Sequence, residues 1–190
     1  ILLVFLFAAC TSVPDEIMTP YVDFPETREL TARTLSLDSA LFRYPYRVRV
    51  QDDKAVVLDL HGTEYFFHAF HYPGFHYLSS FGKRGDAPEE MLSAENLRWN
   101  GNFLWTLDSN KSELTRLGFA SSGDSLLRLE AVSLDEELLR ALDFVQYDDS
   151  TFIIPDYSGD SRFCLVSLQG KLLHKIGTIP TTDEDAFKNA

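Results

Sequence analysis

The chain has 190 residues, of which 45% are hydrophobic, enough to build the core of one domain of ordinary size. Its formal net charge of −12 would repel the phosphate backbone of nucleic acids, so we expect no nucleic-acid partner. Aromatic residues make up 13% of the chain, and this favours β-strands.

The N-terminal residues 1–9 (ILLVFLFAA) form an unbroken apolar run that ends at Cys10. As a helix, this run would rise only about 14 Å, far short of the roughly 30 Å hydrocarbon core of a bilayer, so we do not expect it to span a membrane. A short apolar run that ends in small residues is typical of a signal peptide before its cleavage site. The sequence predicts that residues 1–9 are the remnant of such a signal.

Residues 7–10 (FAAC) resemble the lipobox of bacterial lipoproteins, with Phe7 where Leu is usual. In that family the processing enzyme cuts before the cysteine, and its sulfur carries the lipid. The resemblance implies lipidation of Cys10, attachment to a lipid membrane, and a location at the bacterial cell envelope after export. A plain secretory signal is the alternative.

Residues 10–27 contain three prolines and several acidic residues without helical or strand periodicity, and we expect them to be a tether. The other cysteine, Cys164, lies in the apolar run 163–166 (FCLV) and is expected to be a small buried hydrophobe. If Cys10 carries a lipid, Cys164 lacks a partner, so we expect no disulfide. Residues 28–37 (RELTARTLSL) form a strand candidate that precedes the rest of the fold.

A repeat organises the remainder of the chain. Each unit has a strand, a polar turn and a second, nearly continuous apolar strand that ends at an aspartate; the pairs are 46–50 with 55–59, 97–99 with 103–108, and 142–147 with 151–156. The closing residues Asp59, Asp108 and Asp156 are 49 and 48 residues apart. Two more strand candidates follow in each unit: 65–72 and 75–81, 112–119 and 126–132, and 162–168 and 172–176.

Four strands in a repeat of roughly 40–50 residues are typical of a β-propeller blade. The sequence therefore predicts an all-β fold over 28–180, a β-propeller fragment of about three four-stranded blades plus one extra N-terminal strand. The blades are expected at about 46–91, 95–139 and 142–180, and 181–190 is expected to begin a connection to a further blade. We therefore expect the chain to be the N-terminal half of a larger propeller. The alternative is that two copies of this half-propeller pair as a dimer. Residues 134–141 are the one helix candidate.

The segment 81–90 (FGKRGDAPEE) is similar to the connector between blades in TolB-like and NHL-like six-bladed propellers, and best compared with the TolB-like propeller lipoproteins common in gut Bacteroidetes. Ala87 stands where Gly is usual in that connector, and Met91 where Phe is usual. The resemblance covers about 28–180. It implies six blades and an envelope location, and it transfers no catalytic residue.

Two groups of side chains could carry chemistry. His68, His71 and His76 lie close in the sequence, but alternation along a strand points the first two to opposite faces, so we expect an aromatic outer hairpin and no metal site. The repeated aspartates could bind a cation at a channel mouth, but a repeated position favours capping of the following turn. We therefore assign no catalytic, cofactor-binding or metal residue and expect no cofactor.

The function predicted from the sequence is a binding or scaffold module, a lipoprotein that presents a propeller face to a protein, peptide or glycan. The alternative is a propeller hydrolase or lyase with a metal or acidic site in the central channel, which would draw ligands from several blades. The fold alone cannot decide between the two, because one fold hosts many functions.

Overall fold

The computed structural model describes residues 25–35, 37, 40–157 and 161–178 of the chain, which comprises two units, 1–34 and 35–190. In the first unit, residues 25–34 have neither helix nor strand and are exposed. The predicted extra strand at 28–37 is not formed in its described residues, because a strand requires hydrogen-bonding partners and none of the sheets includes this segment. The signal remnant, Cys10 and most of the tether lie outside the described residues.

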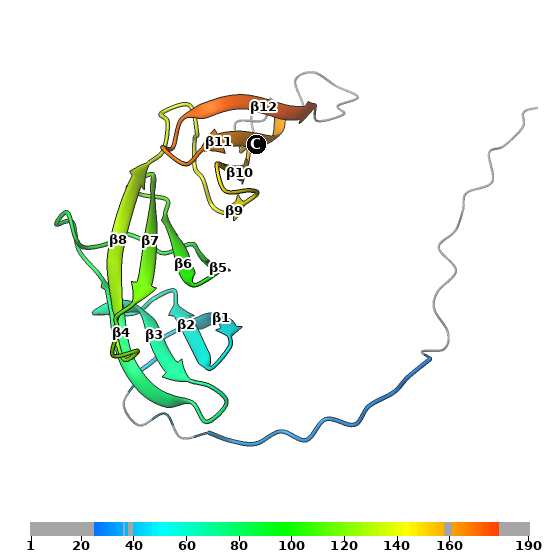
Figure 1. Cartoon of the computed structure of the whole chain (residues 1–190), viewed down its shortest axis with the longest axis vertical. Coiled ribbons are helices and arrows are strands. Elements are labelled where there is room, and N and C mark those ends of the chain that lie inside the picture. Colours follow the sequence, from blue (N-terminus) through cyan, green and yellow to red (C-terminus); the bar gives the residue numbers. More distant parts are fainter. Residues whose placement is uncertain (1–24, 36, 38–39, 158–160, 179–190) are drawn as a thin grey trace, which may run out of the picture. The chain divides into compact units, whose positions relative to one another are not determined.

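The described part of the second unit consists of three four-stranded antiparallel sheets, each a meander of strands in chain order (Figure 1). The first sheet contains β1 (Pro45–Gln51), β2 (Lys54–Asp59), β3 (Tyr65–His71) and β4 (His76–Lys83). The second contains β5 (Asn96–Asn100), β6 (Phe103–Asp108), β7 (Glu113–Phe119) and β8 (Leu126–Ser133). The third contains β9 (Val145–Gln146), β10 (Thr151–Pro155), β11 (Ser161–Ser167) and β12 (Leu172–Thr178). The prediction of an all-β fold with about three four-stranded sheets is confirmed.

The tight turns are where the sequence places them. Asn100 pairs with Phe103, which leaves a two-residue turn, and Gly101 in that turn has a φ of 53°. Glycine reaches such a positive φ without the steric cost that a side chain would add. Pro155 is the last residue of β10, a position where its missing N–H removes little from the ladder.

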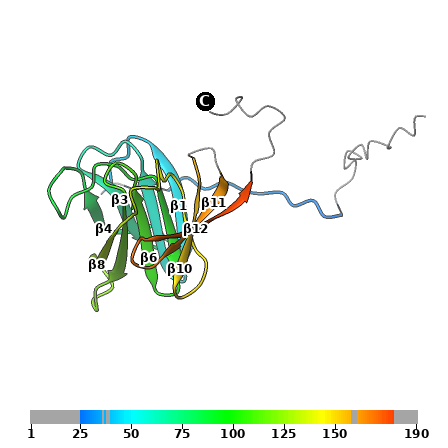
Figure 2. The ribbon, with the colours of Figure 1, turned by 90° about the horizontal axis from the view of Figure 1, so that it is seen from above.

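Neighbouring sheets pack face to face, so β6, the second strand of the middle sheet, is covered on both sides. Between the first and second sheets lie buried apolar residues such as Leu58, Phe67 and Leu104. Between the second and third lie Trp105 and Phe152, whose rings meet edge to face at 5.0 Å. Each fully buried large side chain contributes about 1.5–3 kcal/mol to folding. Figure 2, turned by 90°, shows the strands of the three sheets overlying one another.

The predicted helix at 134–141 is wrong, because the described residues include no helix and this segment forms turns. Leu134, Leu138 and Ala141 are buried between the second and third sheets, a spacing that also fits a helix face. The backbone, however, donates to neighbouring loops: the Leu134 N–H bonds Ser112 O at 2.7 Å, and the Asp135 N–H bonds Gly170 O at 2.8 Å. So short an isolated helix would be marginal, and these external bonds replace its own.

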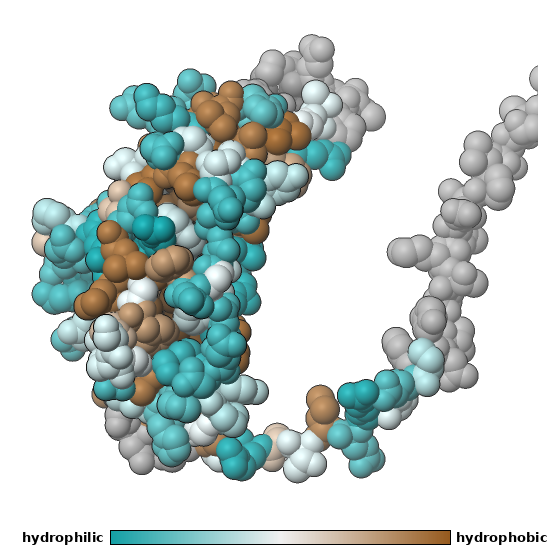
Figure 3. All heavy atoms as spheres, viewed as in Figure 1, coloured by the Kyte–Doolittle hydropathy of each residue, from teal (hydrophilic) through white to brown (hydrophobic). Residues whose placement is uncertain are grey.

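Apolar side chains remain exposed on the outward faces of the first and third sheets. Val48 and Val50 on β1 are 47% and 46% exposed, and Phe163 on β11 is 43% exposed. Leu173 on β12 is 52% exposed. Figure 3 shows apolar surface over the region of β12. Among the described residues, no helix is of the length and apolar character that crossing a membrane requires.

Candidate functional site on the inner strands

The first strands of the three sheets, β1, β5 and β9, lie on the same side of the second unit (Figure 1). Along β1, side chains alternate between two faces. Arg47, Arg49 and Gln51 form the face toward the second sheet. The Arg47 guanidinium donates to Asn96 Oδ1, Arg49 Nε donates to Leu97 O at 3.2 Å, and Gln51 Nε2 donates to Gly101 O. Polar bonds therefore join the first two sheets along this side.

A second set of polar bonds joins β5 to the third sheet. Arg98 Nη2 donates to both carboxylate oxygens of Asp143, at 2.9 and 3.0 Å, and Asn96 Nδ2 donates to Asp143 Oδ1. Partial burial acts to raise the pKa of Asp143, but the bonds from Arg98 and from the Phe144 N–H outweigh it and hold this pKa below its usual value. The carboxylate is therefore ionised at neutral pH, and a chain of bonds runs from Arg47 of the first sheet through Asn96 of the second to Asp143, just ahead of the third.

Positive charge gathers on this side of a chain whose net charge is −12. Burial first, and then repulsion from Arg47 and Arg98, lower the pKa of the Arg49 guanidinium below its usual value, while Asp143 opposes the shift. The guanidinium nevertheless stays protonated, because its intrinsic pKa is so high. Of these three guanidinium groups, only that of Arg98 forms an ion pair with Asp143, while Arg47 and Arg49 bond neutral oxygens.

A groove of about 500 Å³ crosses the inner strands beside these arginines. Its polar lining consists of Arg49, Gln51, Arg98, Trp99, Asn100 and Gln146. Its apolar lining includes Trp105 and Phe144, which belong to the core between the second and third sheets. Because the groove is lined by residues of β1, β5 and β9, its shape depends on how the three sheets pack. We call it the inner-strand groove.

The architecture and the comparison with known families agree. Residues 23–190 match the TolB-like 6-blade propeller-like family. This chain belongs to that family. The prediction of a TolB-like propeller is therefore confirmed, and the inner-strand groove lies on the strands that line the central channel when blades of this kind close into a ring.

Solved structures support the fold of this TolB-like chain. A Bacteroides fragilis protein provisionally described as exported is 12% identical, with a TM-score of 0.58 over 75% of this chain and 40% of the other. Another B. fragilis protein, provisionally described as a 6-phosphogluconolactonase, is 10% identical, with a TM-score of 0.50 over 70% of this chain and 40% of the other. The chain thus spans about two fifths of these structures. No curated protein sequence matches it significantly.

Two of the repeated aspartates, Asp59 and Asp108, accept hydrogen bonds from backbone N–H groups. The buried Asp108 accepts from the N–H groups of Asn110 and Lys111 at 3.1 and 3.0 Å, which confirms the predicted capping of the following turn. Its other oxygen accepts from the Leu92 N–H at 2.7 Å, ahead of β5. Asp59 bonds the equivalent segment ahead of β1, through the Tyr44 N–H at 2.6 Å. Asp156 lies 3.4 Å from Lys175 Nζ.

The predicted aromatic outer hairpin is confirmed as β3 and β4. His68 is buried with Nδ1 2.8 Å from Ser80 Oγ, and burial lowers its pKa. His71 is exposed on the other face, 3.3 Å from Asp53. Phe75 packs on Phe70, with ring centroids 5.9 Å apart. The described residues contain no group of three or more His, Cys, Asp or Glu side chains placed to share a metal ion.

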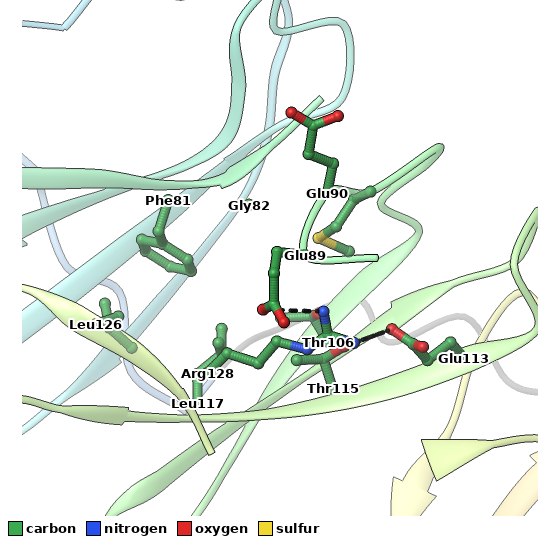
Figure 4. Close-up of a pocket in the computed structure, with 11 residues that line it drawn as sticks. Phe81, Gly82, Glu89, Glu90, Thr106, Glu113, Thr115, Leu117, Leu126 and Arg128 are labelled. Atoms are coloured by element: carbon green, nitrogen blue, oxygen red, sulfur yellow. Dashed lines mark hydrogen bonds and ion pairs between the residues drawn. The ribbon is translucent and has the colours of Figure 1, made fainter. Parts of the chain in front are cut away.

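The connector after β4 is fastened to the second sheet by Arg128. Figure 4 shows this side chain pointing toward Glu89 and Glu113 beneath Phe81. Arg128 Nη2 donates to Glu113 at 2.9 Å, and Nη1 donates to Pro88 O and lies 3.3 Å from Glu89. The cavity beside it measures only about 120 Å³. Because Arg128 is engaged within the protein, we interpret this region as structural.

Cys164 is buried in the core between the second and third sheets, as predicted. Burial raises the pKa of its thiol. The predicted lipidation site, Cys10, lies outside the described residues. Sequence reasoning missed the arginines of the inner strands. The repeat offered a signal, since Arg98 follows Arg49 by the same 49 residues that separate Asp108 from Asp59.

Proposed function

We propose that this TolB-like chain belongs to an exported lipoprotein of the bacterial cell envelope, which is anchored through Cys10 and binds a ligand on its inner strands. The anchor is supported by the apolar run 1–9 and the lipobox-like residues 7–10. Export is also consistent with the B. fragilis structural neighbour provisionally described as exported. The partners are the lipid membrane and a protein, peptide or glycan ligand.

One observation favours a binding role. Arg47, Arg49 and Arg98 gather beside one groove although the chain as a whole is acidic. Like charges placed together cost free energy unless a partner of opposite sign compensates them. Asp143 compensates only in part, so the remaining positive potential fits recognition of an acidic ligand.

The anchor can be tested by labelling cells with a fatty-acid analogue while they express the full-length protein. We expect Cys10→Ala to abolish the label and release the protein from the membrane fraction. Cys164→Ala is the matched control, because it removes the other cysteine and should leave the label unchanged. Unchanged labelling of Cys10→Ala would overturn the lipoprotein assignment.

The binding role is tested separately on the purified full-length protein. We expect it to bind an acidic ligand and return that ligand unaltered, as followed by mass spectrometry. Cleavage of the ligand, with activity lost in Asp143→Asn, would show an enzyme and contradict the proposed binding role.

A further inference from the structure

The segment just ahead of β1 lies over the face of the first sheet that points away from the second sheet. We call its residues 40–44 the strap. Phe42 of the strap stacks on Phe70, with ring centroids 6.1 Å apart, and packs edge to face on His68 at 4.9 Å. Ala40 is buried in the same apolar cluster. The imidazole of His68, on β3, is therefore covered by the strap.

His68 is 6% exposed, and only one of its two ring nitrogens has a hydrogen-bond partner within the described structure. Nδ1 lies 2.8 Å from Ser80 Oγ, which in turn lies 2.8 Å from the Tyr77 hydroxyl. Nε2 is shielded from solvent and lacks a partner there. A neutral ring can leave Nε2 without a proton, whereas a protonated ring carries an N–H on both nitrogens. Protonation would therefore bury a charged N–H without an acceptor, which is costly.

One carboxylate acts on His68 from the end of β2. Asp59 attracts the protonated ring and so acts to raise the pKa of His68. Its two oxygens, however, accept from the N–H groups of Arg43 and Tyr44 in the strap, at 2.8 and 2.6 Å. Burial outweighs the attraction and holds the pKa of His68 below its usual value. At neutral pH the ring is therefore uncharged while Asp59 binds the end of the strap.

The other titratable neighbours of His68 surround a hollow of about 350 Å³ that also borders Ala40 of the strap. They are Glu64, in the turn before β3, Tyr65, at the start of β3, and Tyr77 on β4. None of them is hydrogen-bonded to His68 Nε2. If the strap moves away, water from this hollow can reach the ring and hydrate its charged form.

We propose that protonation of His68 releases the strap from the first sheet, so that this face opens in mildly acidic solution. The neutral ring favours the closed strap, and this contribution is complete above the ordinary histidine pKa of about 6.5. It is lost as the pH falls below that value, because the open form takes up the proton more readily than the closed form. Since the strap directly precedes β1, acid acts on the junction between the propeller and the chain ahead of it.

Hydrogen exchange of the full-length protein, followed by mass spectrometry at about pH 7.5 and about pH 5.5, tests the proposal on either side of the histidine pKa. The protection factor is the ratio of intrinsic to observed exchange rates, so it removes the chemical dependence of exchange on pH and reports local opening. We expect protection of the peptide 40–46 to fall by about threefold or more at the lower pH. Peptides from β6, in the second sheet, should keep their protection.

Three variants assign the effect to one side chain. His68→Gln keeps a polar group at this position but cannot titrate, so protection of the peptide 40–46 should be the same at both pH values. His71→Gln removes an exposed histidine of the same strand and should behave as the wild type does. Circular dichroism confirms that each variant is folded. His68→Phe, whose ring also cannot titrate, keeps the test valid if His68→Gln does not fold.

Three outcomes would overturn the proposal. Unchanged protection of the wild-type peptide 40–46 in acid would show that the strap stays closed. An equal loss of protection in the wild type and in the His68 variants would show that another group responds to pH. An equal loss in the peptides from β6 would show that acid loosens the sheets together, without a local release of the strap.

Discussion

Arg98 of β5 and Asp143 at the start of the third sheet form a two-pronged ion pair, with Nη2 at 2.9 and 3.0 Å from the two carboxylate oxygens. The side chains are 34% and 38% exposed, so the pair lies at the boundary between the core and solvent. Asn96 and the Phe144 N–H donate to the same carboxylate. Asp143 therefore links the second and third sheets on the side that carries the inner-strand groove.

Asp143→Asn should lower the free energy of unfolding by about 1 kcal/mol, a value reduced for the partial exposure of the pair. The matched control is Glu130→Gln, which breaks the ion pair of Arg116 and Glu130 at 3.0 Å within the second sheet. This pair does not join two sheets, and its loss should cost less, about 0.5 kcal/mol. Urea unfolding of both variants measures the difference, and equal costs would contradict a linking role for Asp143.

The contribution of Asp143 to the free energy of unfolding should depend on pH. Its pKa is lower in the folded protein than in the unfolded chain, so its stabilisation is complete above the unfolded value of about 3.9 and is lost as the pH falls through the folded pKa. The difference in unfolding free energy between wild type and Asp143→Asn should thus be constant near neutral pH and shrink in acid. A urea series from pH 7 downward measures it. A difference that grows in acid would show that the carboxylate is not stabilised in its charged form.

Asp108→Ala should be among the most destabilising substitutions in the second sheet. It leaves the N–H groups of Leu92, Asn110 and Lys111 without their acceptor, at a cost of about 3 kcal/mol. Asp148→Ala removes a similar turn contact, to the Ser150 N–H at 2.8 Å, but at an exposed site where water can replace the acceptor, so its cost should be smaller. Thermal unfolding of both variants tests the ranking, and a reversed order would mean that Asp108 is not essential to the blade.

Gly170 has a tighter requirement for glycine than Gly101, although both have a positive φ, of 82° and 53°. A Cβ on Gly170 would lie 2.0 Å from the backbone oxygen of Ser133, whereas one on Gly101 would have no atom within 4 Å. Gly101→Ala should lower the free energy of unfolding by about 1 kcal/mol, because an alanine is strained at a positive φ. Gly170→Ala carries the same strain and must also displace the end of β8. We expect Gly170→Ala to lower the melting temperature clearly more. Similar melting temperatures would show that the turn between β11 and β12 can move away from the end of β8 at little cost.

The parts of the fold that local sequence determines were predictable, and the parts that depend on packing between sheets were not. Asn100-Gly101 specifies its turn because glycine accepts a positive φ there. The burial spacing of Leu134 and Leu138 suggested a helix, but neighbouring loops supply the hydrogen bonds of that segment. The groove could not be predicted from one strand, since it forms only when β1 packs beside β5 and brings Arg49 near Arg98.

The exposed outward face of the first sheet leads to the last prediction. In a TolB-like 6-blade propeller each blade has a neighbour on both sides, so in the closed ring of the full-length protein a further blade should cover Val48, which is 47% exposed here. Val48→Asp would then bury an unpaired carboxylate and should cost about 3 kcal/mol or more. Leu30→Asp is the control, because Leu30 is 92% exposed outside the sheets and its replacement should cost little. Urea unfolding of the two full-length variants decides between the outcomes: a Val48→Asp variant as stable as Leu30→Asp would mean that no blade packs on this face.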